Sequence, residues 1–414
     1  MQTVSAVIIG AGHSGLAMSN TLTAEGIDHI VVERGAIGQA WRSERWDSLT
    51  LLTPNWANGL PGAPYCGADP HGYQKVGAFA AGLTRYAALF GAPVQTATDV
   101  EAVSRSGDHF TIATSTGPIC AKAVVLATGA CAKPHLPAIA QAAPRDLCHL
   151  TPATYKRPDD LPQGGVLVVG ASASGVQIAH EIQASGRPVT LAVGGHTRLP
   201  RTYRGRDIEW WLDALGVLDE RAHEMDDLER ARKIPSPQIV GGPQPVDLNA
   251  LQELGVTVVG RLADIRDGEA LFSGGLSSLT LSADLKMHRL LDAIDGFAQE
   301  TGLAATLNDV QRPEPTRLPR APILSKNLLS GEFGSVIWAT GYRPHHGFIN
   351  LPVFDRRGRL RHDGGVCEIP GLYALGLPFL RRRRSQQISG AGPDAGDLAR
   401  HLVHHLKGAP RAAA

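Results

Sequence analysis

The sequence predicts an α/β fold of three layers, built from two Rossmann-like dinucleotide-binding domains with a mostly helical insertion. Residues 5–35 and 165–195 share one pattern, in which an apolar run leads into a glycine-rich turn and then a helical segment. Each stretch is typical of a βαβ unit, which builds a parallel sheet covered by helices. With 414 residues, the chain is long enough for two domains of ordinary size.

The first glycine-rich turn has the spacing of a dinucleotide-binding motif. Gly10, Gly12 and Gly15 form a G-x-G-x-x-G turn directly after the apolar run, and Ser14 lies within it. Glycines at these positions permit a tight turn and a close approach to a pyrophosphate, which the helix N-terminus attracts. Glu33 ends the next predicted strand, where a carboxylate can bind a ribose hydroxyl. The segment therefore predicts a nucleotide site.

The second turn departs from the motif at one position. It contains Gly170, Ser174 and Gly175, but Ser172 stands where the middle glycine is usual. The Cβ of a serine makes close approach of a phosphate harder, so an ordinary βα turn is the alternative. The βαβ context favours a second nucleotide site.

The residues after this second unit bear on the choice of cofactor. The strand predicted over 189–193 ends in two glycines, with no acid to bind a ribose 2′-hydroxyl. Arg198 and Arg201 follow closely, and guanidinium groups suit a 2′-phosphate. This pattern favours NADPH over NADH, while a solvated loop is the alternative role of these arginines.

Taken together, these motifs resemble those of the class B flavin-dependent monooxygenases, which include the flavin-containing and N-hydroxylating monooxygenases and bacterial FAD/NAD(P)-binding oxidoreductases. The other shared features are residues 41–49 (WRSERWDSL), Thr53-Pro54-Asn55, and two strands that end in Ala-Thr-Gly at 127–129 and 339–341. The resemblance implies FAD at the first turn and NADPH at the second. It also implies an enzyme in which a C4a-peroxyflavin oxygenates a small organic substrate at nitrogen or sulfur, or less often by Baeyer–Villiger insertion.

The motifs and the resemblance together predict the cofactor contacts. For FAD these are Gly10, Gly12, Ser14, Gly15, Glu33, Arg34, Trp41, Arg42, Thr128, Gly129 and Gly376. For NADPH they are Gly170, Ser172, Ser174, Gly175, Arg198, Arg201, Ala339, Thr340 and Gly341.

Two residues are candidates for a catalytic role. His149 is part of what remains of the family signature F-x-G-x-x-x-H-x-x-x-Y, with Tyr155 displaced by two residues, and a loop histidine is the alternative. Asn55 lies near the place of a family asparagine beside the flavin, although Leu52 occupies that place itself. Much of the chemistry belongs to the cofactor, so a dedicated protein acid or base is not required.

The predicted organisation follows from the order of the motifs. We expect an FAD-binding domain at 1–160 and 323–414 and an NADPH-binding domain at 161–322, with the chain passing between them at the two Ala-Thr-Gly segments. The insertion spans about 201–322, with its clearest helices at 208–218 and 285–298. A last helix is expected at about 394–406, after Gly392-Pro393.

Composition limits the partners and the location. A net charge of +1 and the lack of a long apolar run argue against nucleic acid and membrane partners, so we expect a cytoplasmic protein that binds a small molecule and oxygen. A homodimer is one option for its assembly. A four-arginine run at 381–384 is either a solvated face or a contact to a phosphate or an acidic substrate.

Five scattered cysteines without a C-x-x-C pair argue against dithiol exchange, and we expect no metal site. The alternatives to a monooxygenase are an NAD(P)H-dependent flavin reductase or oxidase without oxygen insertion, and a non-catalytic flavin- or nucleotide-binding redox sensor.

Overall fold

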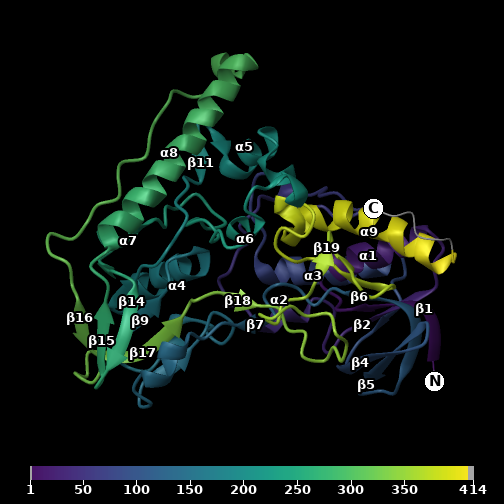
Figure 1. Ribbon diagram of the computed structural model, residues 1–414. Helices are drawn as coiled ribbons and strands as arrows, with labels where there is room; N and C mark the ends of the chain where they lie inside the picture. Colours follow the sequence, from purple (N-terminus) through teal and green to yellow (C-terminus); the bar gives the residue numbers. More distant parts are fainter. Residues whose placement is uncertain (1, 409–414) are drawn as a thin grey trace.

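The computed structural model describes residues 2–408, which form two sheet-centred lobes (Figure 1). The strands of the first lobe are β1 (Gln2–Ile9), β2 (His29–Val32), β3 (Val94–Gln95), β4 (Val100–Ser106), β5 (His109–Thr114), β6 (Ile119–Leu126), β19 (His362–Asp363), β20 (Val366–Cys367) and β21 (Leu372–Ala374). They form one sheet in the order β19-β20-β21-β6-β1-β2-β3, and the antiparallel pair β4-β5 joins it at β6. Strands β3, β2, β1, β6 and β21 are parallel.

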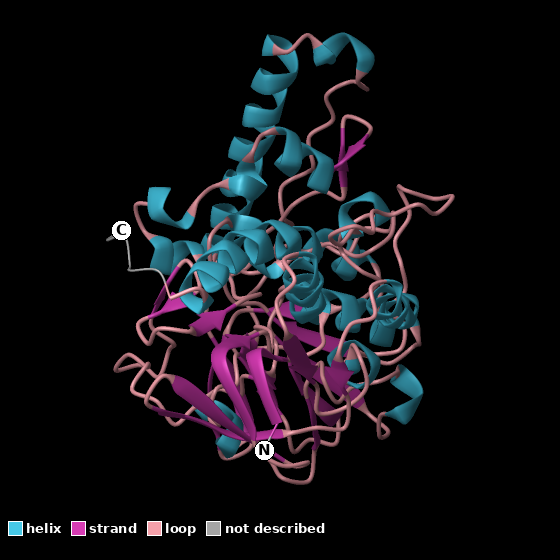
Figure 2. Cartoon of the chain, turned by 90° about the vertical axis from the view of Figure 1, so that its right-hand side faces the viewer, coloured by secondary structure: helices cyan, strands magenta, loops and turns pink. Residues whose placement is uncertain are grey.

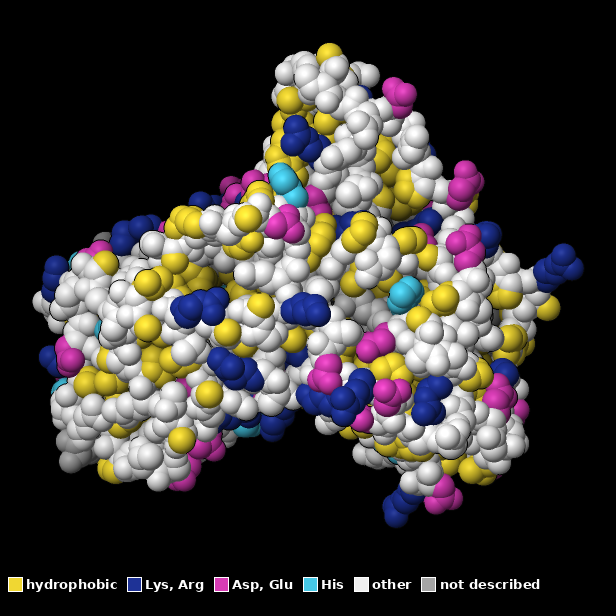
Figure 3. Space-filling model, turned by 180° about the vertical axis from the view of Figure 1, so that it is seen from behind, with side chains coloured by type: hydrophobic (Ala, Val, Ile, Leu, Met, Phe, Trp, Pro, Cys, Tyr) yellow, Lys and Arg dark blue, Asp and Glu magenta, His cyan; other side chains and the backbone are white. Residues whose placement is uncertain are grey.

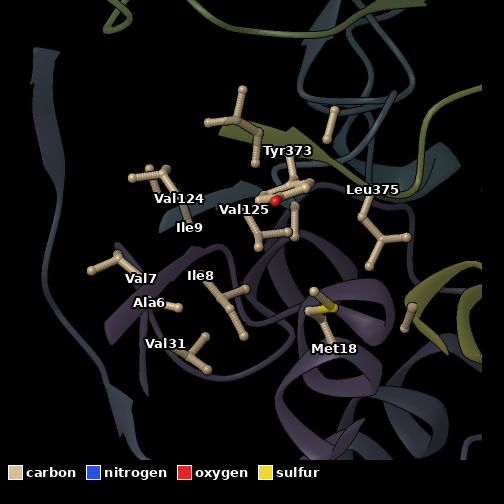
Figure 4. Packing of buried hydrophobic residues seen from close by; sticks show 14 of the residues in the cluster. Ala6, Val7, Ile8, Ile9, Met18, Val31, Val124, Val125, Tyr373 and Leu375 are labelled. Carbon is tan, nitrogen blue, oxygen red and sulfur yellow. The ribbon is translucent and has the colours of Figure 1, made fainter. Parts of the chain in front are cut away.

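The core of the first lobe lies between this sheet and three helices, α1 (His13–Ala24), α3 (Val76–Leu89) and α9 (Ile388–Leu406). Strand β1 is apolar and buried from Ala6 to Ile9, as expected of a central parallel strand covered on both faces. Figure 4 shows Met18 of α1 beside residues of β1, with Tyr373 and Leu375 in the same cluster. A short helix, α2 (Gln39–Ser43), follows β2.

The second lobe has its own parallel sheet. Its strands are β8 (Cys148–Leu150), β9 (Gly165–Val169), β10 (Val189–Ala192), β13 (Thr257–Val259) and β17 (Phe333–Trp338), in the order β13-β10-β9-β17-β8. Helices α4 (Ala173–Ala184) and α7 (Leu248–Glu253) pack on it. Strands β14 (Leu262–Arg266), β15 (Glu269–Phe272) and β16 (Ser325–Asn327) form a separate antiparallel sheet.

Two segments therefore lie in a different sheet from the one their expected domain implies. The sequence placed 148–150 and 333–338 with the FAD-binding domain, but β8 and β17 are strands of the second sheet. Strand β17 is buried from Ser335 to Trp338 because it pairs with β9 on one side and β8 on the other.

The chain passes between the lobes at two neighbouring connections. One follows β6 and contains β7 (Lys133–Pro134), and the other follows β17 and contains β18 (Tyr342–Arg343). The two short strands pair antiparallel, Tyr342 opposite Pro134, so the connections lie side by side (Figure 1).

The region 201–322 holds β11 (Thr202–Tyr203), β12 (Arg206–Asp207), α5 (Ile208–Ala214), α6 (Leu228–Ala231) and α8 (Leu276–Glu300). Helix α8 is longer than expected and projects from the body of the molecule (Figures 1 and 2). The region also supplies the strands β13 to β15, which the sequence analysis did not predict.

The last helix also begins earlier than predicted. Helix α9 starts at Ile388, so Pro393 lies inside it rather than at its start. A proline there removes one backbone hydrogen bond, but Ile388 and Ala391 precede it and are buried in the core of the first lobe. Their burial offsets the lost hydrogen bond.

Candidate nucleotide-binding and active site

A single cavity of about 1510 Å³ is lined by both glycine turns and by residues of both lobes. Figure 3 shows the indentation between the lobes on one face of the molecule. Pockets for one drug-sized ligand hold about 300–1,000 Å³, so this cavity has room for more than one small ligand.

The first turn depends on glycine at two positions for packing and leaves space at a third. Gly10 has a φ of +108°, and a Cβ on it would lie 2.6 Å from the carbonyl oxygen of Ala127. A Cβ on Gly15 would lie 1.9 Å from the carbonyl oxygen of Gly10. A Cβ on Gly12 would meet nothing within 4 Å, and Gly12 lines the cavity. This open space at the N-terminus of α1 is where a pyrophosphate can approach.

The second turn repeats this geometry. Gly170 has a φ of +109°, and a Cβ on it would lie 2.3 Å from the carbonyl oxygen of Ala339, while one on Gly175 would lie 1.9 Å from that of Gly170. Each turn thus packs against the Ala-Thr-Gly segment of its own lobe. Ser172 has a φ of −83° and a ψ of −179°, extended backbone that any residue adopts, so its Cβ does not strain the turn.

Two of the residues predicted to contact FAD, Glu33 and Gly376, lie near the first turn. Glu33 is buried, lines the cavity, and accepts hydrogen bonds from the backbone N–H of Ala11 (2.8 Å) and Gly35 (3.1 Å). Gly376 has a φ of +76°, and a Cβ on it would lie 2.6 Å from Ser14 Oγ. Gly376 therefore contributes by permitting close packing against α1.

The other predicted FAD residues divide into two groups. Trp41, Thr128 and Gly129 line the cavity, and the buried Thr128 hydroxyl has no protein partner, which leaves it for a ligand. Arg34 lines the cavity and pairs with Glu44. Arg42 does not line it and donates instead to the carbonyl oxygens of residues 37 and 80 and to the hydroxyl of residue 84.

Around the second turn, Gly170, Ser172, Ser174, Ala339, Thr340 and Gly341 line the cavity. The Thr340 hydroxyl donates to the carbonyl oxygen of His135. It therefore joins the two inter-lobe connections rather than facing a nucleotide.

The structure contradicts the expected role of the two arginines. Arg198 is 3% exposed, and its guanidinium contacts Asp247 at 2.7 Å and Asp284 at 2.8 Å. Arg201 pairs with Asp207 and donates to the carbonyl oxygen of Leu52 at 2.8 Å. Neither arginine lines the cavity, so carboxylates rather than a phosphate compensate their charges.

A different arginine stands beside the two glycines that follow β10. A Cβ on Gly194 would lie 3.7 Å from Arg261 Cγ, and Gly194, Gly195 and Arg261 all line the cavity. Arg261 is exposed and has no ion pair among the described residues. Arg261 was not predicted from the sequence, because β13, the strand before it, was not predicted.

Neither predicted catalytic residue lines the cavity. His149 lies on the edge strand β8, where its Nδ1 accepts from Trp338 Nε1 at 3.2 Å and its Nε2 lies 2.9 Å from the carbonyl oxygen of Pro144. Asn55 is buried and donates to the carbonyl oxygen of Asp69 at 2.8 Å. Both side chains hold local structure, which corrects their assignment as catalytic.

Three arginines of the four-arginine run form close ion pairs, and one of them, Arg383, also lines the cavity. Arg382 contacts the fully buried Asp394 of α9 at 2.8 Å. Arg383 pairs with Glu220 at 2.5 Å, and Arg384 with Asp213 at 2.5 Å. The run therefore fastens the segment after α5 to the first lobe.

Two titratable groups on the cavity wall were not predicted. His13 follows Gly12, and burial lowers its pKa to about 4, while its Nε2 has no protein partner. Glu209 of α5 is 6% exposed, and burial raises its pKa to about 7. Neither residue could be predicted from the sequence. His13 occupies an x position of the G-x-G-x-x-G turn, and Glu209 is a lone acid that belongs to no motif.

A family model described as pyridine nucleotide-disulphide oxidoreductase matches residues 7–214. The chain belongs to this family. An uncharacterized CzcO-like oxidoreductase of Geobacillus kaustophilus is 31% identical over 97% of the chain and 99% of its own length. Indole-3-pyruvate monooxygenase YUCCA6 of Arabidopsis thaliana is 30% identical over 96% of the chain and 89% of its own length.

A flavin-containing monooxygenase of Stenotrophomonas maltophilia shares the fold, with a TM-score of 0.69 at 20% identity over 98% of this chain and 99% of that one. The predicted α/β fold with two dinucleotide-binding units, the resemblance to flavin-dependent monooxygenases and the assignment to the oxidoreductases are thereby confirmed.

This oxidoreductase has the features that a flavin and a nicotinamide nucleotide require. The N-termini of α1 and α4 both face the cavity, through His13 and Ala173, and the space at Gly12 and the unpartnered Thr128 hydroxyl leave room for a ligand. Its five cysteines are free. Residues 2–408 contain no helix long and apolar enough to cross a membrane, and no group of three metal-ligating side chains.

Proposed function

We propose that this oxidoreductase is an NADPH-dependent flavin monooxygenase that inserts one oxygen atom of O₂ into a small organic substrate, at nitrogen or sulfur. The observation that carries the proposal is the shared cavity, because two equivalent nucleotide turns from different lobes line it. The names of YUCCA6 and of the Stenotrophomonas enzyme, both monooxygenases, support it.

The residues of the two turns are compatible with one nucleotide at each turn. The N-terminus of α1 and Gly12 would hold the FAD pyrophosphate, and Glu33 its ribose. The N-terminus of α4, with Ser172 and Ser174, would hold the NADPH pyrophosphate, and Arg261 its 2′-phosphate. When bound, the flavin supplies hydride acceptance and oxygen activation.

The protein contributes position and exclusion of water. Apolar side chains from several segments line the cavity, among them Trp41, Leu51, Phe379 and Ile388. A dry site protects reactive cofactor states from side reactions. The neutral form of His13, favoured by burial, places no extra positive charge beside the flavin site.

The proposal includes a division of the chain at the paired connections. Residues up to β7 and from β18 onward would form the FAD-binding domain, and the residues between them the NADPH-binding domain, because this division keeps each sheet within one domain.

Isotope labelling tests this function. The FAD-loaded enzyme is supplied with NADPH, ¹⁸O₂ and a panel of amines, thioethers and ketones. We expect one ¹⁸O atom in the product for each NADPH oxidised, with the second oxygen atom leaving as water. Stoichiometric hydrogen peroxide without labelled product would instead identify an oxidase, and flavin that NADPH does not reduce would identify a redox sensor.

A further inference from the structure

Glu209 is a buried carboxyl on the cavity wall whose charge is left uncompensated. It lies in the first turn of α5, is 6% exposed, and its buried Oε1 has no hydrogen-bond partner. Leaving an ionisable group buried without a partner is costly, so such a group points to a missing ligand.

The neighbouring arginines do not form an ion pair with Glu209. Asp207 and Asp213 lie on its own segment, and Arg201 and Arg384 face it from neighbouring segments. Arg201 already pairs with Asp207, and Arg384 pairs with Asp213 and Asp219. Each arginine therefore has a carboxylate of its own, and Glu209 is the surplus negative group.

Apolar side chains form part of the cavity wall on the segment of Glu209, and the cations Arg232, Lys233 and Arg383 line the same cavity. Leu212 follows it by one helical turn and also lines the cavity, as do Val217 and Leu218. Phe379 and Ile388 line the same cavity from the first lobe. A ligand that fits this wall has an apolar body and one positively charged or hydrogen-bond-donating group.

We propose that Glu209 binds the basic nitrogen of the substrate, which is therefore a small apolar amine. This inference rests on the proposed function. The ammonium proton moves from nitrogen to Glu209 Oε1, which frees the nitrogen lone pair. An N–O bond then forms with one atom of O₂, and NADPH supplies the two electrons as a hydride. The other oxygen atom leaves as water, whose two hydrogens balance the hydride of NADPH and the proton that Glu209 took up and then releases.

The burial that raises the pKa of Glu209 to about 7 suits such a proton acceptor, because acid and base forms then exchange near neutral pH.

Two probes of nearly the same shape separate charge from shape. N,N-dimethylbenzylamine is a cation at neutral pH, and benzyl methyl sulfide is neutral. For Glu209→Gln we expect kcat/KM for the amine to fall about 10- to 100-fold, mainly through KM, and kcat/KM for the sulfide to stay within about threefold. The pH dependence near 7 for the amine should disappear in this variant.

Two further variants guard against misfolding and surface effects. Glu224→Gln removes an exposed acid from the same insertion and should leave kcat/KM unchanged for both the amine and the sulfide. Leu212→Lys places a competing cation one turn from Glu209 and should impair the amine while sparing the sulfide.

Equal losses for both probes, or a raised KM for NADPH with unchanged amine selectivity, would overturn the assignment. Equilibrium binding of the amine keeps this test separate from the proposed function. If the wild type oxygenates neither probe, amine binding that is lost in Glu209→Gln still supports the inference, and failure of the wild type to bind the amine refutes it.

Discussion

At the scale of single residues, the glycines of the first turn have different tasks. Gly15→Ala would place a Cβ 1.9 Å from the carbonyl oxygen of Gly10, so we expect the apoprotein to lose about 3 kcal/mol of stability. Gly12→Ala meets no protein atom, and should leave the apoprotein intact while weakening FAD binding about tenfold or more. Chemical unfolding of the apoproteins and flavin titration check the pair. Equal destabilisation by both variants would contradict this division.

Arg261 is expected to determine the choice of nicotinamide nucleotide. Because its side chain lies over Gly194 and has no ion-pair partner among the described residues, Arg261→Ala should lower the preference for NADPH over NADH about 10- to 100-fold. The ratio of the flavin reduction rates with NADPH and with NADH measures this preference. Arg266→Ala, on β14 and paired with Asp264, is the control and should leave the preference unchanged.

Glu209 also predicts a pH dependence of stability. Its pKa is about 7 in the folded protein against an ordinary value of 4.5, so between these values the folded state retains a proton that the unfolded chain has released. Stability should therefore fall as pH rises from about 4.5 to about 7, by about 3 kcal/mol in total from this group and by about 2 kcal/mol between pH 5.5 and pH 8.5. Melting temperatures of wild type and Glu209→Gln at pH 5.5 and 8.5 check this. Between these pH values the melting temperature of the wild type should fall more than that of Glu209→Gln. An equal fall in both proteins would contradict the prediction.

At the residue scale, local spacing was sufficient to predict the backbone of the two glycine turns. The glycine turns and Glu33 follow from backbone sterics within one βαβ unit, which sequence spacing reveals. Arg198 and Arg201 could not be assigned this way, because the partners of Arg198 are 49 and 86 residues away in the chain. Only the folded structure shows that carboxylates neutralise these arginines.

At the scale of elements, the arginine run holds α9 and the insertion in place. Arg382→Ala would leave the fully buried Asp394 without its counter-ion, and we expect a loss of about 3 kcal/mol in unfolding free energy. Arg384→Ala removes pairs to partly exposed carboxylates and should cost less than about 1 kcal/mol. Denaturant unfolding of both variants is the measurement. A smaller loss for Arg382→Ala than for Arg384→Ala would refute the ranking.

Element boundaries were predictable where hydrophobic periodicity is strong. The ends of β6 and β17 lie just before the Ala-Thr-Gly segments, as predicted, but β13 to β15 are short and were interpreted as part of a helical insertion. The start of α9 was missed because Pro393 is typical of a helix start. Tertiary burial of Ile388 overrides that local signal.

At the scale of the whole molecule, the two lobes create a site that neither turn forms alone. The paired strands β7 and β18 return the chain beside its first crossing, so both Ala-Thr-Gly segments line one cavity. The order of motifs in the sequence predicted two nucleotide units. It could not predict the part of the cavity where we propose that the substrate binds, because α5 lies there close to residues near 52 and 384, which are far apart in sequence.

The most direct test of oxygenation is rapid mixing of the NADPH-reduced enzyme with oxygen. The proposed function predicts that the flavin passes through a species with an absorbance band that neither oxidised nor reduced flavin shows. It also predicts that this species decays faster when an oxygenated substrate is added. Direct return of oxidised flavin with stoichiometric peroxide, at a rate that no substrate changes, would contradict it.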